Sequence, residues 1–392
     1  MNCSNNNNMP QYLTFHCLLV LCIAVAGCKK EPLYDSQPAS NSRTIIVYLG
    51  VDNNFRAEAI QKINQLTDSW DKTTDGNLLV YADTGRNPAL VHIYHTPQHG
   101  NVADTVETYP AENSASPETF ARVLNRAKTY RPAASYGLVV LSHATGWLPV
   151  EMSSPGPVLK SVIMDKQAGK INNCMELSDF AQAIPYKLDF IIFDACFMGS
   201  VEVAYELRDK ADCIVASPAE VLVPGFAYTS MMQHLFAPVP NLMAVAHEFY
   251  DYYNGQTGMS RSATVSVVKT TELETLANAV KNITQQNAFY DKLENIQTYG
   301  YGTQKIYFDL GDYMLKLSSG SPQAATLIQQ FQAALDRCIT YMACTPSYYS
   351  SGTSAMQPLN AFSGLSVYIP QATYPVANEA YGMLKWALVT GN

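Results

Sequence analysis

A near-continuous apolar run from Leu188 to Phe193 constrains the fold more than any other stretch of the chain. Such a run without polar alternation is typical of a strand covered on both faces, as in a parallel α/β sheet. It ends at Asp194-Ala195-Cys196, and Gly199-Ser200 then offers a turn and a helix N-cap. The Cys196 thiol is therefore expected at the carboxyl end of a strand, where open α/β sheets bind ligands. A buried structural cysteine remains the alternative on this stretch alone.

A second apolar run, Gly137 to Leu141, predicts another buried strand. It is followed by Ser142-His143-Ala144, so an imidazole follows this strand as a thiol follows the first. Neighbouring parallel strands bring their carboxyl ends to one edge of a sheet. We therefore expect His143 and Cys196 to meet, although 53 positions separate them.

The earlier part of the chain alternates predicted strands and helices, which implies an α/β fold with a parallel sheet and right-handed crossovers. Ala57, Ile60, Ile63 and Leu66 repeat at helical spacing. The expected strands are Arg43 to Asp52, Asn77 to Asp83 and Leu90 to Tyr94. The expected helices are Asn54 to Trp70 and Ser116 to Tyr130. The second helix would be capped by Ser116, with Pro117 at its first position.

Beyond Tyr301 the pattern predicts a helix from Pro322 to Ala343 and a last strand from Leu365 to Ile369. No charge run or low-complexity linker separates two domains. We assign residues 43–300 to the main domain and residues 301–392 to a C-terminal subdomain packed on the same sheet.

With 392 residues, of which 47% are hydrophobic, the chain can bury a large core. Its net charge of −8, without a dense Lys/Arg run, argues against nucleic acid as a partner.

The N-terminus has the pattern of an export signal. The apolar stretch from Leu13 to Ala26 is too short for a membrane span, and it leads into Val25-Ala26-Gly27-Cys28, which resembles a bacterial lipoprotein signal. We predict a signal peptide over residues 1–27, lipidation of Cys28, and a flexible tether over residues 28–42. The protein would then be exported and lipid-anchored to the bacterial outer membrane or cell surface. An uncleaved N-terminal anchor is the alternative.

Two segments together resemble the clostripain group of cysteine peptidases: SHATGW, from Ser142 to Trp147, and FDACFMGSVEVAYEL, from Phe193 to Leu207. The likeness covers roughly residues 43 to 370. It implies a caspase-like three-layer sandwich with a mostly parallel central sheet, and peptide or protein substrates. Family members normally have glycine after the histidine, whereas this chain has Ala144.

The resemblance implies a role for each matching residue. Cys196 would be the nucleophile and His143 the general acid/base. The backbone N–H groups of Ala144 and Cys196 would form the oxyanion hole. No cofactor is implied, although some relatives use calcium, for which Asp309 and Asp312 are the weak candidates.

Substrate preference is left open by the sequence. In the family an acidic pocket confers preference for Arg or Lys. The segment that would hold its second acid is VLVPGFAY, Val221 to Tyr228, which has no acid after Glu220. Asp194 and Glu220 are the remaining candidates, and an apolar or small side chain is the alternative preference.

The other histidines are further candidates. His99, followed by Gly100, is a minor candidate for the general base. His92, His95 and His99 have a loose metal-ligand spacing, but all three lie in or near a polar loop. Cys338 and Cys344 could form a disulfide. The stretch from Pro149 to Ala168, with Lys160 and Lys166, resembles an exposed loop that some relatives cleave during activation.

The sequence thus predicts an exported cysteine endopeptidase. Two alternatives remain: a catalytically silent surface lipoprotein that binds peptides, and a thiol hydrolase or transferase that acts on a non-peptide acyl group.

Overall fold

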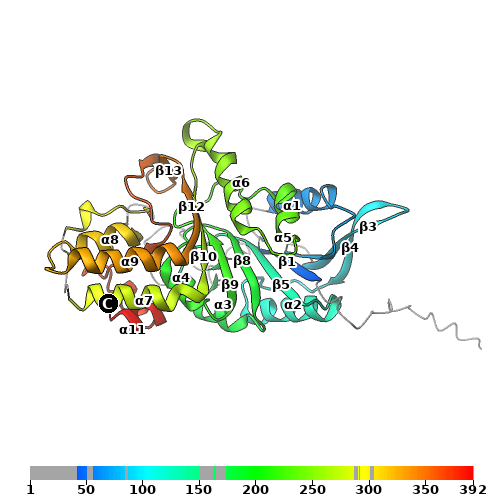
Figure 1. Ribbon diagram of the computed structural model, residues 1–392. Helices are drawn as coiled ribbons and strands as arrows, with labels where there is room; N and C mark the ends of the chain where they lie inside the picture. Colours follow the sequence, from blue (N-terminus) through cyan, green and yellow to red (C-terminus); the bar gives the residue numbers. More distant parts are fainter. Residues whose placement is uncertain are drawn as a thin grey trace, which may run out of the picture. The chain divides into compact units, whose positions relative to one another are not determined.

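A mixed nine-stranded sheet lies at the centre of the part of the chain that this computed structural model describes (Figure 1). The described residues are 42–50, 56–83, 87–149, 162–164, 174–286, 290, 292–300 and 304–391. The strand order is β12-β10-β9-β8-β5-β1-β2-β3-β4. Their bounds are β1 Arg43–Gly50, β2 Gly76–Asp83, β3 Ala89–Thr96, β4 Gly100–Thr108, β5 Ser135–Leu141, β8 Leu188–Asp194, β9 Ala211–Ala216, β10 Thr264–Lys269 and β12 Ile339–Cys344.

The middle of the sheet is parallel, as the apolar runs predict. Strands β2, β1, β5, β8 and β9 all run the same way, and β1 is buried along its whole length. Both ends of the sheet differ from this expectation, since β3 and β4 pair antiparallel on one side and β10 and β12 on the other. The connection from β2 to β3 is only a few residues long, which is too short for a parallel crossover.

Helices cover both faces of the sheet, so the fold has three layers (Figure 1). One face packs against α1 (Arg56–Asp68), α5 (Tyr228–Leu235) and α6 (Leu242–Asn254). The core on the other face includes side chains from a larger set of helices: α2 Pro117–Tyr130, α3 Leu177–Ala183, α4 Val201–Glu206, α7 Leu273–Thr284, α8 Leu310–Ser318, α9 Ala324–Cys338, α10 Pro375–Gly382 and α11 Lys385–Thr390. This arrangement confirms the α/β sandwich that the sequence predicts.

Two predicted helix starts are confirmed by their caps. Ser116 Oγ accepts a hydrogen bond from the N–H of Thr119, and Pro117 occupies the first turn of α2. Ser200 Oγ accepts from the N–H of Val203 at 3.2 Å and so begins α4 directly after the Cys196 loop. Each cap satisfies one of the N–H groups that a helix leaves without a partner.

The predicted helix from Pro322 to Ala343 is wrong in its last part. Helix α9 ends at Cys338, and the chain continues as β12, which pairs antiparallel with β10. Ile339, Thr340 and Tyr341 are β-branched or aromatic, which favours a strand where a sheet edge is available. The chain beyond residue 301 therefore adds a strand to the central sheet. All the described residues fall in one compact unit, and a domain boundary near residue 300 stays a prediction.

The smaller strands pair outside the central sheet. The predicted last strand is β15, which pairs with β11. Among the described residues, no helix has the length and apolarity that a membrane span requires. The remaining bounds are β6 Ile163–Met164, β7 Cys174–Met175, β11 Phe308–Asp309, β13 Ser347–Ser350, β14 Ala355–Pro358 and β15 Ser366–Val367, with short 3-10 helices at Gly258–Ser260, Thr270–Glu272 and Leu293–Asn295.

Candidate active site

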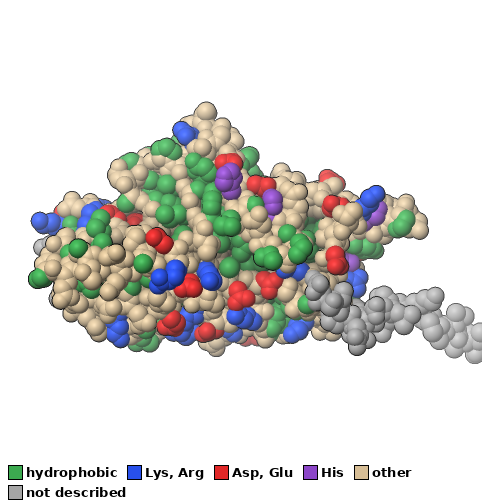
Figure 2. Space-filling view, viewed as in Figure 1, with side chains coloured by type: hydrophobic (Ala, Val, Ile, Leu, Met, Phe, Trp, Pro, Cys, Tyr) green, Lys and Arg blue, Asp and Glu red, His purple; other side chains and the backbone are tan. Residues whose placement is uncertain are grey.

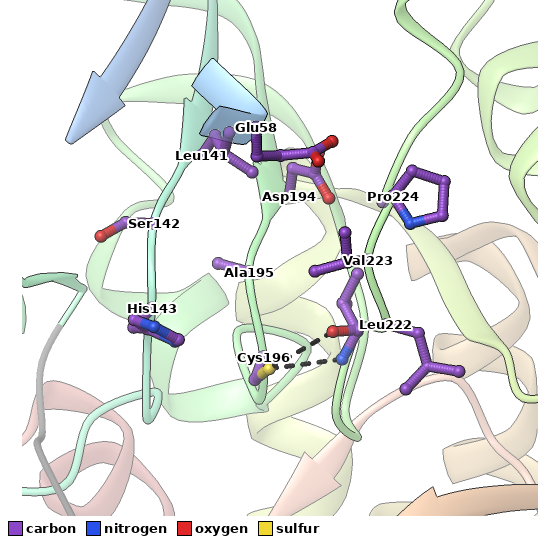
Figure 3. A pocket seen from close by; sticks show the side chains of 12 residues that line it. Glu58, Leu141, Ser142, His143, Asp194, Ala195, Cys196, Leu222, Val223 and Pro224 are labelled. Atoms are coloured by element: carbon purple, nitrogen blue, oxygen red, sulfur yellow. Dashed lines mark hydrogen bonds between the residues drawn. The ribbon is translucent and has the colours of Figure 1, made fainter. Parts of the chain in front are cut away.

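His143 and Cys196 follow neighbouring parallel strands at the same level of the sheet. Strands β5 and β8 pair with Leu141 opposite Asp194, and each candidate lies two residues beyond its member of that pair. Both residues line one cavity, in which His143 and Cys196 lie at one end of the lining and Asp194 at the other (Figure 3). The juxtaposition predicted from the sequence is therefore present in the structure.

The two loops that carry these residues pack on each other. Gly146, three residues after His143, has a φ of +64°, which glycine adopts without strain. A Cβ atom on Gly146 would lie 2.8 Å from the carbonyl oxygen of Phe197, so only glycine allows this approach. Phe197 itself has a φ of 59°, a conformation that costs a non-glycine residue energy and that packing must hold. The chain thus bends sharply directly after the candidate nucleophile.

The sulfur of Cys196 contacts the backbone of Val221. The N–H of Val221 donates to Sγ at 3.3 Å, and Sγ lies 3.8 Å from the carbonyl oxygen of the same residue (Figure 3). Burial raises the pKa of the thiol to about 12, and the Val221 N–H opposes this shift only in part. Burial therefore favours the neutral thiol of Cys196, and a base beside it would help to produce the thiolate at neutral pH.

Asp194 lines the cavity, as its place at the end of β8 suggests. Its side chain is buried, and the N–H of Phe226 donates to Oδ2 at 3.3 Å. Burial raises the pKa of Asp194 to about 6, while the positive charge of Lys62 and the Phe226 hydrogen bond pull it down. Gly225 packs so closely that a Cβ atom there would lie 2.2 Å from Oδ1.

Glu220, the other predicted pocket acid, does not line this cavity. Its Oε1 accepts a hydrogen bond from the N–H of Ser351 at 2.9 Å, so its carboxylate is directed toward the β13–β14 hairpin. The second acid of the cavity is Glu58, on α1, which lies beside Asp194 (Figure 3). The sequence analysis missed Glu58 because its helix is about 140 positions from Cys196 and carries no recognisable motif.

The remaining histidine candidates lie elsewhere. His99 is in the turn that joins β3 to β4 and does not line the cavity. His92 is buried and stacks on Tyr94 with ring centroids 4.7 Å apart, and burial lowers its pKa to about 4. His95 Nδ1 lies 2.9 Å from Asn101 Oδ1. Over the described ranges, no cluster of three or more His, Cys, Asp or Glu side chains could hold a metal ion.

The two calcium candidates have protein partners. Asp309 caps α8 by accepting from the N–H of Asp312 at 2.9 Å, and it also accepts from the Tyr299 hydroxyl and the Ser363 N–H. Asp312 pairs with Lys316 at 2.7 Å. These carboxylates organise the start of α8.

Cys338 and Cys344 are both free thiols, so the suggested disulfide is wrong. Cys338 directly precedes β12 and Cys344 ends it, and an extended strand of that length separates them by about 20 Å, whereas a disulfide requires Cα atoms within about 7 Å. Cys28, the signal segment and the tether up to residue 41 lie outside the described residues, as do Lys160, Lys166 and most of the stretch from Pro149 to Ala168.

Known proteins share this fold. The clostripain family model matches residues 47–379. A zymogen C11 protease from Parabacteroides distasonis, described as inactive, superimposes with a TM-score of 0.77 at 31% identity, covering 90% of this chain and 99% of that one. A secreted C11 cysteine protease from Bacteroides thetaiotaomicron, solved with an irreversible peptide inhibitor, gives 0.77 at 28% identity, covering 89% and 98%. Clostripain from Hathewaya histolytica is 24% identical over 224 residues, which span 50% of this chain and 42% of that protein.

The sheet and its helical layers define a protein of the C11 cysteine protease class, which is an α/β fold with a mostly parallel central sheet. The chain belongs to the clostripain family.

Proposed function

We propose that the chain is an exported cysteine endopeptidase in which Cys196 is the nucleophile and His143 the general acid/base. The observation that carries this proposal is the register of β5 and β8, which sets both side chains at one cavity. Nucleophile and base from separate loops are the usual arrangement for acyl transfer through a thiol.

The proposed reaction follows from the protonation state of the thiol. His143 removes the proton as Cys196 Sγ attacks the peptide carbonyl carbon, so that a C–S bond forms and the oxygen becomes negative. The tetrahedral intermediate collapses, the C–N bond breaks, and the amine leaves with the proton from His143. Water, deprotonated by His143, then attacks the thioester, releases the carboxylic acid and regenerates the thiol.

The N–H groups of Ala144 and Cys196 are proposed as the oxyanion donors. Over the described residues, neither N–H donates a hydrogen bond to another part of the chain. A well-aimed donor of this kind contributes about 3 kcal/mol to catalysis. Ala144 replaces the glycine usual at this position in the family, and its N–H serves the same purpose because the donor is a backbone group.

Peptide or protein substrates and a lipid anchor at Cys28 complete the proposal. A solved relative is described as secreted, which supports export. On the face in Figure 2, acidic and basic side chains are interspersed over the described residues. Labelling of growing cells with an alkyne fatty acid should tag the wild type and leave Cys28→Ala untagged.

Hydrolysis assays test the catalytic assignment. A mixed set of fluorogenic peptides and a set of simple acyl esters are compared between wild type, Cys196→Ala and His143→Ala. We expect peptide cleavage that falls about 10⁴-fold in the Cys196 variant and about 10²- to 10⁴-fold in the His143 variant. Cleavage of esters alone would favour an acyl hydrolase, and equal activity in Cys196→Ala would overturn the proposal.

A further inference from the structure

A buried lysine lies behind the wall of the proposed active-site cavity. Lys62, on α1, is fully buried, with a side-chain exposure of 1%. Its Nζ donates to the carbonyl oxygens of Pro224 at 2.5 Å and Phe226 at 3.1 Å. It also lies 4.3 Å from the ring centroid of Tyr228. A lysine so completely enclosed is uncommon and needs compensating charge.

That compensation comes from the two acids of the cavity. Lys62 Nζ lies 3.4 Å from Glu58 Oε1, and its positive charge lowers the pKa of Asp194. Glu58 and Asp194 lie together at the end of the cavity away from the Cys196 sulfur (Figure 3). Two carboxylates at that point would by themselves suit a substrate Lys or Arg side chain, but here the chain supplies the cation itself.

The Asp194 carboxylate also contacts the backbone of the segment that forms one wall of the cavity. The N–H of Phe226 donates to its Oδ2, and the backbone of Gly225 packs directly against its carboxylate. A basic side chain that reached this end of the cavity would come close to the positive charge of Lys62 as well as to the two acids, and like charges repel strongly in a low-dielectric site. An uncharged side chain meets no such penalty.

Most of the remaining cavity lining is apolar. Apart from Ser142, His143 and the two acids, the residues lining the cavity are Leu141, Ala195, Cys196, Val221, Leu222, Val223, Pro224 and Gly225. Aliphatic walls of this kind bind aliphatic side chains by excluding water.

We propose that Lys62 is a specificity-determining residue which pairs with Glu58 and offsets part of the charge of Asp194, so that the peptidase prefers an uncharged aliphatic side chain, of the class of Ala, Val or Leu, immediately before the scissile bond. This inference rests on the proposed function of Cys196. It assigns the preference to a lysine on a helix remote in sequence from both candidate catalytic residues.

The test compares fluorogenic peptides that differ only in having Leu, Lys or Arg before the scissile bond. Wild type should cleave the Leu peptide with a kcat/KM about tenfold or more above that for Lys or Arg. Lys62→Met keeps the shape of the side chain and frees both acids, so the Leu/Lys ratio should shift toward Lys by about 100-fold. A merely structural role for Lys62 would change activity toward all three peptides alike.

Two further variants keep the test decisive. Lys62→Met leaves the Glu58 carboxylate without its ion-pair partner. The double variant Glu58→Gln/Lys62→Met removes both charges of that pair. Its Leu/Lys ratio should shift toward Lys by about tenfold, because only the Asp194 carboxylate remains to attract a basic side chain. Lys187→Met removes an exposed lysine that pairs with Asp212 and should leave the ratio unchanged.

The outcomes separate this inference from the proposed function. Two results would overturn the role of Lys62 alone. One is cleavage that depends on Cys196 but prefers Lys or Arg in wild type. The other is a Leu/Lys ratio of kcat/KM that is unchanged in both Lys62 variants. Cleavage that persists in Cys196→Ala, or no cleavage of any peptide by any variant, would overturn the proposed function and this inference with it.

Discussion

The hydroxyl of Tyr307 donates a hydrogen bond to the carbonyl oxygen of Thr145, two residues after His143. The Tyr307 ring also stacks on Phe197, the residue after Cys196, with centroids 5.0 Å apart and planes 12° apart. One side chain from the C-terminal part of the chain therefore contacts the loops of both candidate catalytic residues. Tyr307 is fully buried, so these contacts are shielded from water.

Tyr307→Phe is predicted to lower kcat by about fivefold with little change in KM, because the His143 loop loses one of its fixed points. The lost hydrogen bond should also cost about 1 kcal/mol of unfolding free energy. Steady-state kinetics and urea denaturation measure the two effects. Tyr186→Phe is the matched control, because Tyr186 donates a similar bond to Leu124 away from the cavity. An equal loss of kcat in both variants would contradict the positioning role.

Gly225→Ala is predicted to destabilise the protein by about 2–4 kcal/mol. Gly225 has a φ of +72°, and an added Cβ would lie 2.2 Å from the Asp194 carboxylate, so the backbone and the acid must both move. Gly382→Ala, where no atom lies within 4 Å of the added Cβ, should change the unfolding free energy by less than about 0.5 kcal/mol. Equal denaturation midpoints for the two variants would show that the contact is not as close as described.

The raised pKa of Cys196, about 12, predicts a particular pH profile for alkylation. Because the pKa lies above neutrality, the thiolate fraction grows about tenfold per pH unit between pH 7 and pH 9. The rate of iodoacetamide labelling at Cys196, followed by peptide mass spectrometry, should rise in parallel. N-acetylcysteine, measured alongside, should level off near its lower pKa. A rate already flat from pH 6 would mean that the thiol rests as a thiolate paired with His143.

Metal removal is predicted to leave peptide cleavage unchanged. Asp309 and Asp312 are engaged by protein donors and by Lys316, so neither is arranged as part of an open cation site. Activity is compared before and after dialysis against EDTA and after addition of calcium. A loss on dialysis that calcium restores would identify a cation requirement.

The sequence predicted the middle of the sheet and the meeting of His143 with Cys196 because those features depend on local patterns. Apolar runs mark strands that are buried on both faces, and parallel neighbours must end at the same edge. The antiparallel strands at both ends of the sheet and the strand after α9 were not predicted. Their direction depends on which sheet edge is available, and that is not encoded in a short stretch of residues.

The residues that form the wall of the cavity were not predicted, for a different reason. Helical spacing predicted Ala57, Ile60 and Leu66 on one face of α1, whereas Ile60 is 50% exposed and the buried face carries Lys62 instead. A lysine in a helical pattern is normally read as solvated. Its burial depends on Glu58 and on carbonyl groups of the chain near Pro224, which only the tertiary structure brings together.

The most direct test of the central claim is the mass of the protein after reaction with a peptide acyloxymethyl ketone that carries Leu at its reactive end. We predict that wild type gains the mass of one peptidyl group, located on Cys196 by fragmentation. Cys213→Ala, which removes a different partly buried cysteine, should gain the same mass, and Cys196→Ala none. Unchanged labelling of Cys196→Ala, or a modification found on another residue of the wild type, would contradict the assignment of Cys196 as the nucleophile.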